Sequence, residues 1–212
     1  NLLYDIQNKL NHLTQLYSLD LGYHKFALFP NLGSCASTIL TLNLEWNNLS
    51  SVSSEDVTSL SSIRDLNLGY NFLSVFPELC SIGSTLETLA LNTNAIRIFE
   101  TERLECLDKI LHLRMWGVPL TSLQNVTVLA DTLFMIGIAY TFLSPSEIVY
   151  IGNLRNLGEL VLTGNDYEDI PDVPTPSTIY YLRLDNNKLK SIPMLKNLGV
   201  RLTVLQIFNN PI

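Results

Sequence analysis

Apolar residues recur along this chain in the pattern L-x-x-L-x-L-x-x-N-x-L, and polar residues fill most of the positions between them. Successive copies are 22 to 24 residues apart, and their first apolar residues are Leu16, Ile39, Ile63, Leu86, Ile110, Leu133, Leu157, Ile179 and Leu202. A fixed period of this length is typical of a solenoid, in which each unit buries its apolar edge only by stacking on its neighbours. The pattern therefore predicts a single repeat array over residues 1–212, with about nine repeats and a partial N-terminal one.

Each copy of the pattern also predicts a strand followed by a turn. The alternation x-L-x-L-x is that of a half-buried strand whose leucines point inward, and units joined by crossovers form a parallel sheet. The Asn of the pattern can donate and accept hydrogen bonds at once, so it can satisfy turn backbone groups that would otherwise be buried unpaired. Three copies lack this Asn, at His24, Val118 and Thr141. Because Val118 and Thr141 belong to neighbouring copies, we expect the row of asparagines to be interrupted there.

A second period of 47 residues divides the units into two kinds. The segment that begins at Leu16 is similar to the one that begins at Ile63, and the same step leads on to Ile110 and Leu157. One kind of unit returns through a proline, in the segments FPNL, FPEL and IPDV. Proline fixes φ and removes a donor, so we expect that return to be extended or polyproline-like and not helical. The other kind has apolar residues six and three positions before the next copy, a spacing that permits a turn or two of helix. The convex side should therefore alternate between helical and extended returns.

Both ends of the chain fall inside a unit. Asn1 and Leu3 occupy the positions of the motif's Asn and final Leu, and the segment NNPI ends the chain at the same point of a later unit. Neither end carries the polar or disulfide cap that terminal repeats need for solubility. We therefore expect an array that is uncapped at both ends and that either belongs to a longer protein or stacks on another molecule.

Composition and charge narrow the classes of partner. Hydrophobic residues make up 47% of the chain and charged residues 16%, which favours a packed core over disorder. A net charge of −7 makes nucleic acid and acidic membrane surfaces poor partners. The strongest candidate for a membrane span runs from Leu133 to Leu143; it is too short, and its apolar residues keep the repeat register. We interpret it as a strand and its turn.

The three cysteines, Cys35, Cys80 and Cys106, fall in the return segments and show no C-x-x-C spacing. Cys80 and Cys106 lie in adjacent units and could pair, because successive units are only a few ångströms apart there. We favour three buried free thiols as the simpler interpretation. The cysteines alone therefore leave the compartment open.

Motifs of catalysis and of cofactor binding are missing from the sequence. It contains no glycine-rich phosphate loop, no G-x-S-x-G and no histidine pair with metal-ligand spacing, because His12, His24 and His112 are far apart. The acidic segment NDYEDIPD at residues 165–172 lacks the spacing of a known calcium loop. We expect a protein that is not an enzyme and that has no catalytic residues, no cofactor and no metal.

The repeated residues resemble those of the leucine-rich-repeat superfamily over essentially the whole chain. The longer units are similar to the typical 24-residue class of animal extracellular receptors and matrix proteins, and the proline units to shorter classes. The alternation of unit kinds is also similar to that of small leucine-rich proteoglycans, although their cysteine caps are missing here. The resemblance implies an α/β repeat fold, a right-handed horseshoe solenoid with a parallel concave sheet, and recognition of proteins or glycans on the concave face. It does not name a ligand, because fold alone does not give function.

The outward positions of the predicted strands change in character along the array. They are mostly polar in the first four units, whereas aromatic residues, Met and Arg without much acid appear from Ile110 onward, which is typical of interface hot spots. With this register each of these positions faces solvent, although scattered exposed apolar residues are also ordinary. The candidate partner-binding residues are His112, Arg114, Trp116, Met135, Tyr140, Val161, Tyr181, Arg183 and Phe208.

A row of aromatic residues follows the strands: Tyr23, Trp46, Tyr70 and Tyr140, interrupted by Thr93 and Gly117. Stacked rings could bind sugar faces or a partner's edge, but we favour packing of the rings on one another along the rim. Asn48-Leu-Ser and Asn125-Val-Thr are possible glycosylation sites if the chain is secreted.

Three functions are compatible with these features. The first is a non-enzymatic recognition or adhesion module, receptor-like and extracellular or at the cell surface, that binds a protein or glycan on its concave face. The second is a structural component of a matrix or filament, in which uncapped ends and apolar patches drive self-association. The third is the repeat domain of a cytosolic scaffold or immune sensor. We favour the first.

Overall fold

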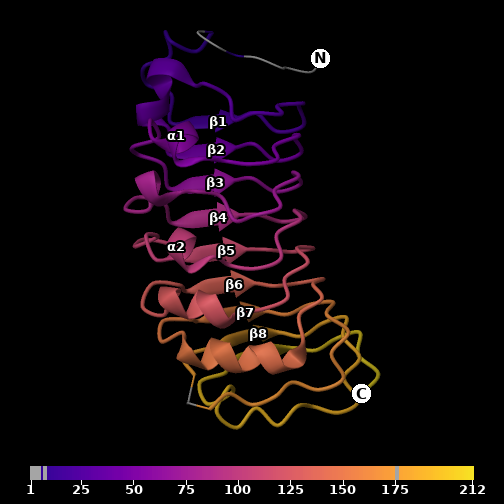
Figure 1. Cartoon of the computed structure of the whole chain (residues 1–212). Coiled ribbons are helices and arrows are strands. Elements are labelled where there is room, and N and C mark those ends of the chain that lie inside the picture. The colour runs from indigo at the N-terminus through magenta and orange to yellow at the C-terminus, as the bar shows by residue number, and fades with distance from the viewer. Residues whose placement is uncertain (1–5, 7–8, 175–176) are drawn as a thin grey trace.

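Each copy of the repeat pattern contributes one short strand to a single parallel sheet, and the strands follow one another in sequence order (Figure 1). The computed structural model describes residue 6 and residues 9–174 and 177–212. The partial N-terminal repeat expected around Asn1 and Leu3 lies outside these residues. The strands are β1 (Ser18–Asp20), β2 (Thr41–Asn43), β3 (Asp65–Asn67), β4 (Thr88–Ala90), β5 (His112–Arg114), β6 (Met135–Gly137), β7 (Glu159–Val161), β8 (Tyr181–Arg183) and β9 (Val204–Gln206).

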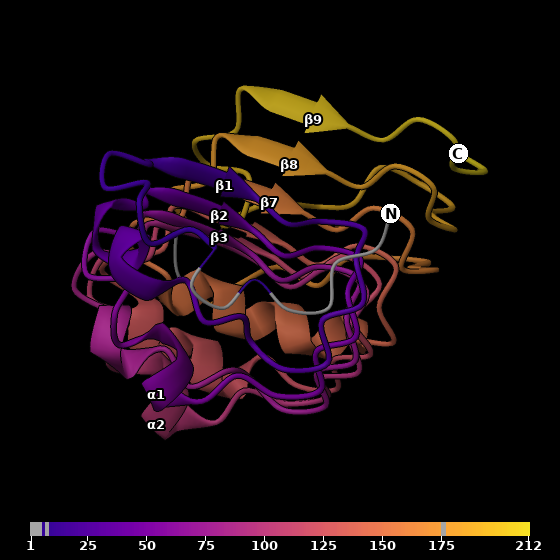
Figure 2. The ribbon, with the colours of Figure 1, turned by 90° about the horizontal axis from the view of Figure 1, so that it is seen from above.

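The register of the sheet keeps equivalent residues of the pattern side by side. The middle residue of every strand is apolar and pairs with the middle residue of the next, as in Leu42↔Leu66 and Leu113↔Ile136. These middle residues are fully buried from β2 to β8. The sheet forms one face of the molecule and the helical returns lie on the opposite face, so the core is enclosed between them (Figure 2). The predicted leucine-rich-repeat solenoid is thereby confirmed.

The convex returns contain short helical pieces in both kinds of unit. Where helix was predicted, the structure has α1 (Ser54–Val57), α2 (Thr101–Leu104) and the 3₁₀ helix η4 (Pro145–Asn153). The prediction that proline returns are not helical is wrong in part, because the 3₁₀ helices η1 (Gly33–Thr38) and η2 (Cys80–Ile82) follow two of the proline segments. A further 3₁₀ helix, η3 (Gln124–Leu129), lies in the unit that begins at Ile110, between the units of α2 and η4. Proline restricts only its own φ and the residue before it. Leu32 and Leu79, which end the segments FPNL and FPEL, have already left the extended region, with ψ of −5° and 11°, and the 3₁₀ helices begin directly after them.

The asparagines of the pattern form the expected ladder along the turns. Asn94 is typical: its Oδ1 accepts from the backbone N of Leu73 at 2.9 Å, and its Nδ2 donates to the carbonyl oxygens of Leu68 and Leu91 at 3.0 Å. The interruption at mid-array is confirmed, because Val118 is buried and has no polar side chain. At Thr141 the hydroxyl donates to Asn165 Oδ1 at 2.9 Å, which restores part of the network.

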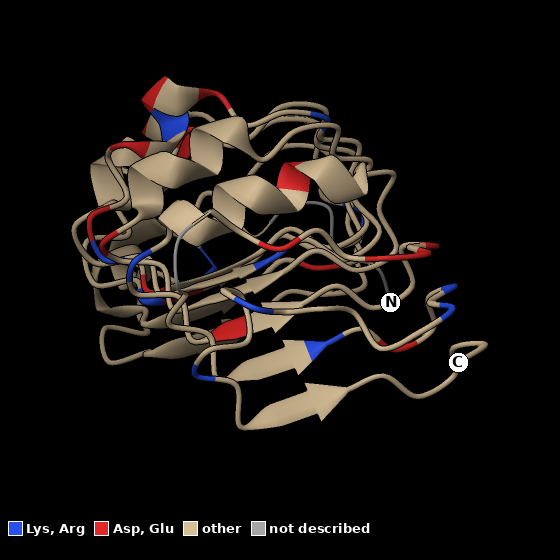
Figure 3. Cartoon of the chain, turned by 90° about the horizontal axis from the view of Figure 1, so that it is seen from below, with Lys and Arg blue, Asp and Glu red and all other residues tan. Residues whose placement is uncertain are grey.

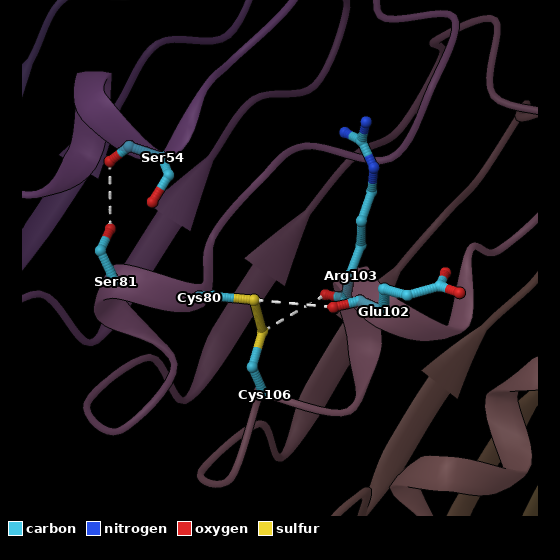
Figure 4. Close-up of a disulfide and its surroundings, with 6 residues drawn as sticks. All are labelled: Ser54, Cys80, Ser81, Glu102, Arg103 and Cys106. Atoms are coloured by element: carbon cyan, nitrogen blue, oxygen red, sulfur yellow. Dashed lines mark hydrogen bonds between the residues drawn. A yellow bond between two sulfur atoms is a disulfide. The ribbon is translucent and has the colours of Figure 1, made fainter.

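Two of the three cysteines form a disulfide. Cys80, at the start of η2, is bonded to Cys106, just beyond α2, and their Cα atoms are 5.2 Å apart (Figure 4). The prediction of three free thiols is therefore wrong for this pair and holds for Cys35, which is buried and free. The pairing depends on how closely the two returns stack: a Cβ added to Gly83 would overlap the backbone oxygen of Cys106.

The apolar segment from Leu133 to Leu143 contains β6 and its turn, as predicted. Within the described ranges, no helix has the length and apolar character needed to cross a membrane.

Candidate functional site: the concave surface of β5–β8

The outward side chains of four neighbouring strands form the candidate site. In the first outward row, His112, Met135, Glu159 and Tyr181 pair in register, and in the second row Arg114, Gly137, Val161 and Arg183 do so. A third row follows each strand and contains Trp116, Ala139, Thr163 and Asp185. We call this set of exposed and half-exposed residues the β5–β8 surface: His112, Arg114, Trp116, Glu159, Tyr181 and Arg183.

Trp116 lies over the neighbouring strand because that strand carries a glycine. The indole Nε1 of Trp116 is 2.5 Å from the position that a Cβ on Gly137 would take, so any larger residue would displace the ring. The backbone N of Trp116 donates to Asn92 Oδ1 at 3.0 Å, which fixes the turn that carries it. Trp116 remains 43% exposed. The indole is therefore held in place on one side and open to a partner on the other.

The two arginines of this surface have different electrostatic environments. Arg183 Nε is 3.0 Å from Asp185 Oδ2, and the Asp185 side chain is fully buried. Arg114 is exposed and forms no ion pair or side-chain hydrogen bond with any described residue. Its neighbours in the row are Ala90 and Gly137, which bring no opposing charge. Arg114 thus presents an uncompensated positive charge beside Trp116, whereas the charge of Arg183 is neutralised within the fold.

Glu159 and two aromatic residues, Phe134 and Tyr180, also belong to this region and are not among the residues predicted from the sequence. Glu159 Oε1 accepts from the hydroxyl of Tyr180 at 2.8 Å, and this hydrogen bond raises the pKa of Tyr180 above its ordinary value. The rings of Phe134 and Tyr180 both lie against Gly158, where a Cβ would come within 2.8 Å of each. The His112 ring meets Phe134 edge-on, with centroids 6.0 Å apart.

The register of the repeat was the available signal for Glu159, which occupies the first outward position of its strand. Asp185 occupies an outward position by the same rule. The expectation of little acid on this half of the sheet is therefore wrong: two carboxylates are present, one hydrogen-bonded to a tyrosine and one paired with an arginine. Asp185 Oδ1 and the neighbouring Thr163 hydroxyl are buried without a partner among the described residues.

The structure does not place all predicted residues on this surface. Met135 and Val161 are each only 9% exposed, so the prediction that every outward position faces solvent is wrong for them. Neighbouring strands are only about 4.8 Å apart, so a large side chain on one strand can cover a smaller outward side chain on the next. Tyr140 and Phe208 are well exposed, but Tyr140 lies in the rim row beyond β6 and Phe208 beyond β9. His112, Arg114, Trp116, Tyr181 and Arg183 are the predicted residues that the sheet brings together.

The rim row of aromatics has the packing that we favoured. Tyr23 and Trp46 stack with centroids 5.7 Å apart, and Trp46 and Tyr70 stack at 4.2 Å. All three have left-handed backbone, with φ of 59°, 55° and 52°, a conformation that bulky residues rarely adopt. We call Tyr23, Trp46 and Tyr70 the aromatic ladder. Tyr140 has the same backbone but packs against Gly164 instead of another ring.

The two sequons differ in their surroundings. Asn48 is exposed and its side chain forms no hydrogen bond with a described residue. Asn125 is half-buried within η3, and its Nδ2 donates to the backbone oxygen of Phe99 at 2.7 Å. Elsewhere in the described chain, no group of three or more His, Cys, Asp or Glu side chains is arranged to hold a metal ion.

Comparison with known proteins bears on the fold. No family model and no curated protein sequence matches the chain. Solved structures do match. The leucine-rich-repeat protein LIC12759 of Leptospira interrogans is 23% identical with a TM-score of 0.62, over 99% of this chain and 65% of that one. The leucine-rich-repeat domain of APL1B is 17% identical with a TM-score of 0.66, over 99% and 66% of the two chains. The internalin inlF of Listeria monocytogenes is 17% identical with a TM-score of 0.63, over 97% and 58%.

These likenesses, together with the nine-stranded parallel sheet, define the fold. The chain has the leucine-rich-repeat fold. It spans two thirds or less of the length of each of these structures.

Proposed function

We propose that this chain is a non-enzymatic recognition module that binds a protein partner through the β5–β8 surface. The observation that carries the proposal is the pair formed by Arg114 and Trp116. An exposed arginine without a counterion stands beside an exposed indole that a glycine holds in place. Trp, Tyr and Arg are the residue types that dominate binding energy at protein interfaces, and a fixed ring loses little entropy on binding.

The charge distribution of the sheet supports the same surface. Figure 3 shows an acidic and a basic segment on the strands at the C-terminal end of the sheet, which are Glu159 in β7 and Arg183 in β8. Both already have partners within the fold, because Glu159 accepts from Tyr180 and Arg183 pairs with Asp185. A partner that supplies a carboxylate to Arg114 would neutralise its charge, and an apolar group could cover Trp116. Among the structural neighbours, the plant peptide hormone receptor RGFR1 was solved in complex with RGF2; it is 23% identical over 96% of this chain, with a TM-score of 0.54.

We place this function outside the cell or at its surface. The support is the Cys80–Cys106 disulfide, since disulfides persist in oxidising compartments and are rare in reducing cytosol. The same bond argues against the repeat domain of a cytosolic scaffold.

The test is a binding comparison between matched variants. Partners from extracellular fluid are captured on the immobilised chain, identified by cross-linking and mass spectrometry, and purified for titration. Arg114→Glu and Trp116→Asp should each weaken binding by about tenfold or more, the loss of a hot-spot residue. Thr41→Glu, an exposed position of β2 on the same face, is the control and should bind like the wild type. The proposal would be refuted if both β5–β8 variants bound like the wild type while their circular dichroism spectra showed that they are folded.

A further inference from the structure

We infer that Asn48 is an N-glycosylation site whose first sugar packs on the exposed aromatic residues around it. The inference goes beyond the recognition function and rests only on the proposed extracellular location. It concerns the opposite half of the array from the β5–β8 surface, on the rim where the turns follow β2 and β3.

The acceptor itself has the right chemistry and access. Asn48 is followed by Leu49 and Ser50, which completes the N-x-S sequon. Asn48 and Ser50 are exposed, while Leu49 between them is fully buried and anchors the turn. The backbone N of Asn48 donates to Phe26 O at 2.9 Å, so the main chain is fixed, while the side-chain amide makes no hydrogen bond to any residue that the structure describes. A glycan can therefore leave this position without disturbing the fold.

Exposed aromatic residues lie near the acceptor in the chain and in the next unit, where the backbone N of Phe72 donates to Leu49 O at 2.8 Å. Trp46 precedes Asn48 by two residues and is 45% exposed. Phe72 occupies the equivalent position in the next unit and is 64% exposed, and Tyr70 stacks on Trp46. The apolar C–H face of a sugar packs well on the electron-rich face of such rings, which also offer a large apolar area.

The aromatic ladder has an energetic cost that calls for an explanation. Left-handed backbone is unfavourable for an L-residue, and glycine or asparagine fills the same position at Gly117, Gly164, Asn186 and Asn209. The stacking of Tyr23, Trp46 and Tyr70 offsets part of this cost. A sugar seated beside Trp46 adds a function to rings that the turn by itself does not need.

Asn125 provides the internal contrast. Its Nδ2 donates to Phe99 O at 2.7 Å and lies half-buried in η3, so its amide already has a structural role. A glycan there would have to emerge beside that bond and the apolar side chain of Ile98, which lines the same small hollow. We therefore assign the glycan to Asn48 and not to Asn125.

The chemical step is a transfer from a lipid-linked oligosaccharide in the secretory pathway. A bond forms between Asn48 Nδ2 and C1 of the first sugar, and the bond from C1 to the lipid pyrophosphate breaks. One proton leaves Nδ2, and the electron pair of the broken bond stays with the pyrophosphate.

The first experiment expresses the full chain with a secretion signal in a eukaryotic cell and measures intact mass before and after peptide N-glycosidase F. The wild type and Asn125→Gln should carry one glycan. Asn48→Gln and Ser50→Ala should carry none; Ser50→Ala keeps the asparagine and removes only the sequon. A secreted wild type without a glycan, or a glycan on Asn125 instead, overturns the assignment. Because secretion is imposed, this failure is distinct from a failure of partner binding.

The second experiment tests the packing of the sugar on the rings. Enzymatic removal of the glycan from folded wild type should lower Tm by about 2–4 °C. In Phe72→Ser and in Trp46→Ala the same treatment should lower Tm by less than half as much. Phe72 is mostly exposed, so its variant folds even if the ladder variant does not. Equal shifts in wild type and Phe72→Ser would contradict the role of the rings.

Discussion

Trp116 and Gly137 face each other across β5 and β6, and the indole occupies the space that a side chain on the glycine would fill. The indole of Trp116 can lie there only because Gly137 has no side chain, and the indole in turn covers the backbone of Gly137. This packing shapes the β5–β8 surface. Variants of these two residues test it, and variants of other contacts test the concave face, the turns and the returns.

Replacing Gly137 by Leu should displace the indole and destabilise the fold by about 1–3 kcal/mol, the usual cost of overpacking. Urea unfolding followed by circular dichroism gives the free energy of unfolding. In the double variant with Trp116→Ala the clash is gone, so the two effects should couple by at least about 1 kcal/mol. Strict additivity would show that the ring and the glycine do not interact.

The two arginines of the second row should differ in their contribution to stability. Arg183→Ala leaves the buried Asp185 carboxylate without its counterion and should cost about 2 kcal/mol or more. Arg114→Ala removes an unpaired exposed charge and should change the free energy of unfolding by less than about 0.5 kcal/mol. Thermal denaturation of both variants under the same conditions measures the difference, and equal Tm values would contradict it.

The asparagine ladder predicts that a buried Asn of the ladder contributes far more to the free energy of unfolding than an exposed Asn outside it. Asn94→Ala leaves the Leu73 amide and two carbonyl groups without partners in the interior, at a cost of about 2–4 kcal/mol. Asn48→Ala in unglycosylated protein removes no side-chain hydrogen bond within the described part of the chain, so the free energy of unfolding should hardly change. Chemical unfolding gives the free energy of unfolding of both variants, and equal values for Asn94→Ala and Asn48→Ala would contradict the prediction.

The disulfide should contribute measurably to stability. Its partners are 26 residues apart, and closing a loop of that size in the unfolded chain corresponds to about 3 kcal/mol. The double variant Cys80→Ser/Cys106→Ser should lose about this amount. Thiol labelling of the denatured, non-reduced wild type should modify one cysteine, Cys35, and labelling of three would show that the bond does not form.

Asp172 should make stability depend on pH in the acidic range. Burial raises the pKa of its carboxyl, but hydrogen bonds from the backbone N of Leu198 and Asn197 outweigh this and lower it below the usual value. A lowered folded-state pKa gives stability that is present above the unfolded pKa, about 3.9, and is lost as pH falls through the folded value. Asp172→Asn should therefore lower Tm at pH 6–7, and the difference should shrink below about pH 4. A difference that stays constant down to pH 2 would refute this.

Most of the fold could be predicted from the sequence, because each copy of the repeat corresponds to one unit that stacks on the next. The inward leucine of each repeat copy predicted the middle of a strand, and in β2 to β5 these residues are buried and paired in register: Leu42, Leu66, Leu89 and Leu113. The helical return at α1 followed from apolar spacing, and its capping box at Ser53 and Asp56 starts it. The 3₁₀ turns after the prolines were missed because proline restrains only its own position and the one before it.

The candidate site was predicted less completely because exposure depends on neighbouring rungs. Met135 and Val161 occupy outward positions, yet both are nearly covered. Glu159 was overlooked although the register assigned it an outward position, and its hydrogen bond to Tyr180 appears only when adjacent strands are placed together.

The sequence by itself determined the solenoid, the inward leucines, the asparagine ladder and its gap at Val118, because each is a local pattern repeated at a fixed period. The tertiary structure decided what depends on distances between units. It paired Cys80 with Cys106, set Trp116 over Gly137, neutralised Arg183 and left Arg114 uncompensated. These contacts join residues about one repeat apart or closer, and their geometry is fixed only when neighbouring units stack.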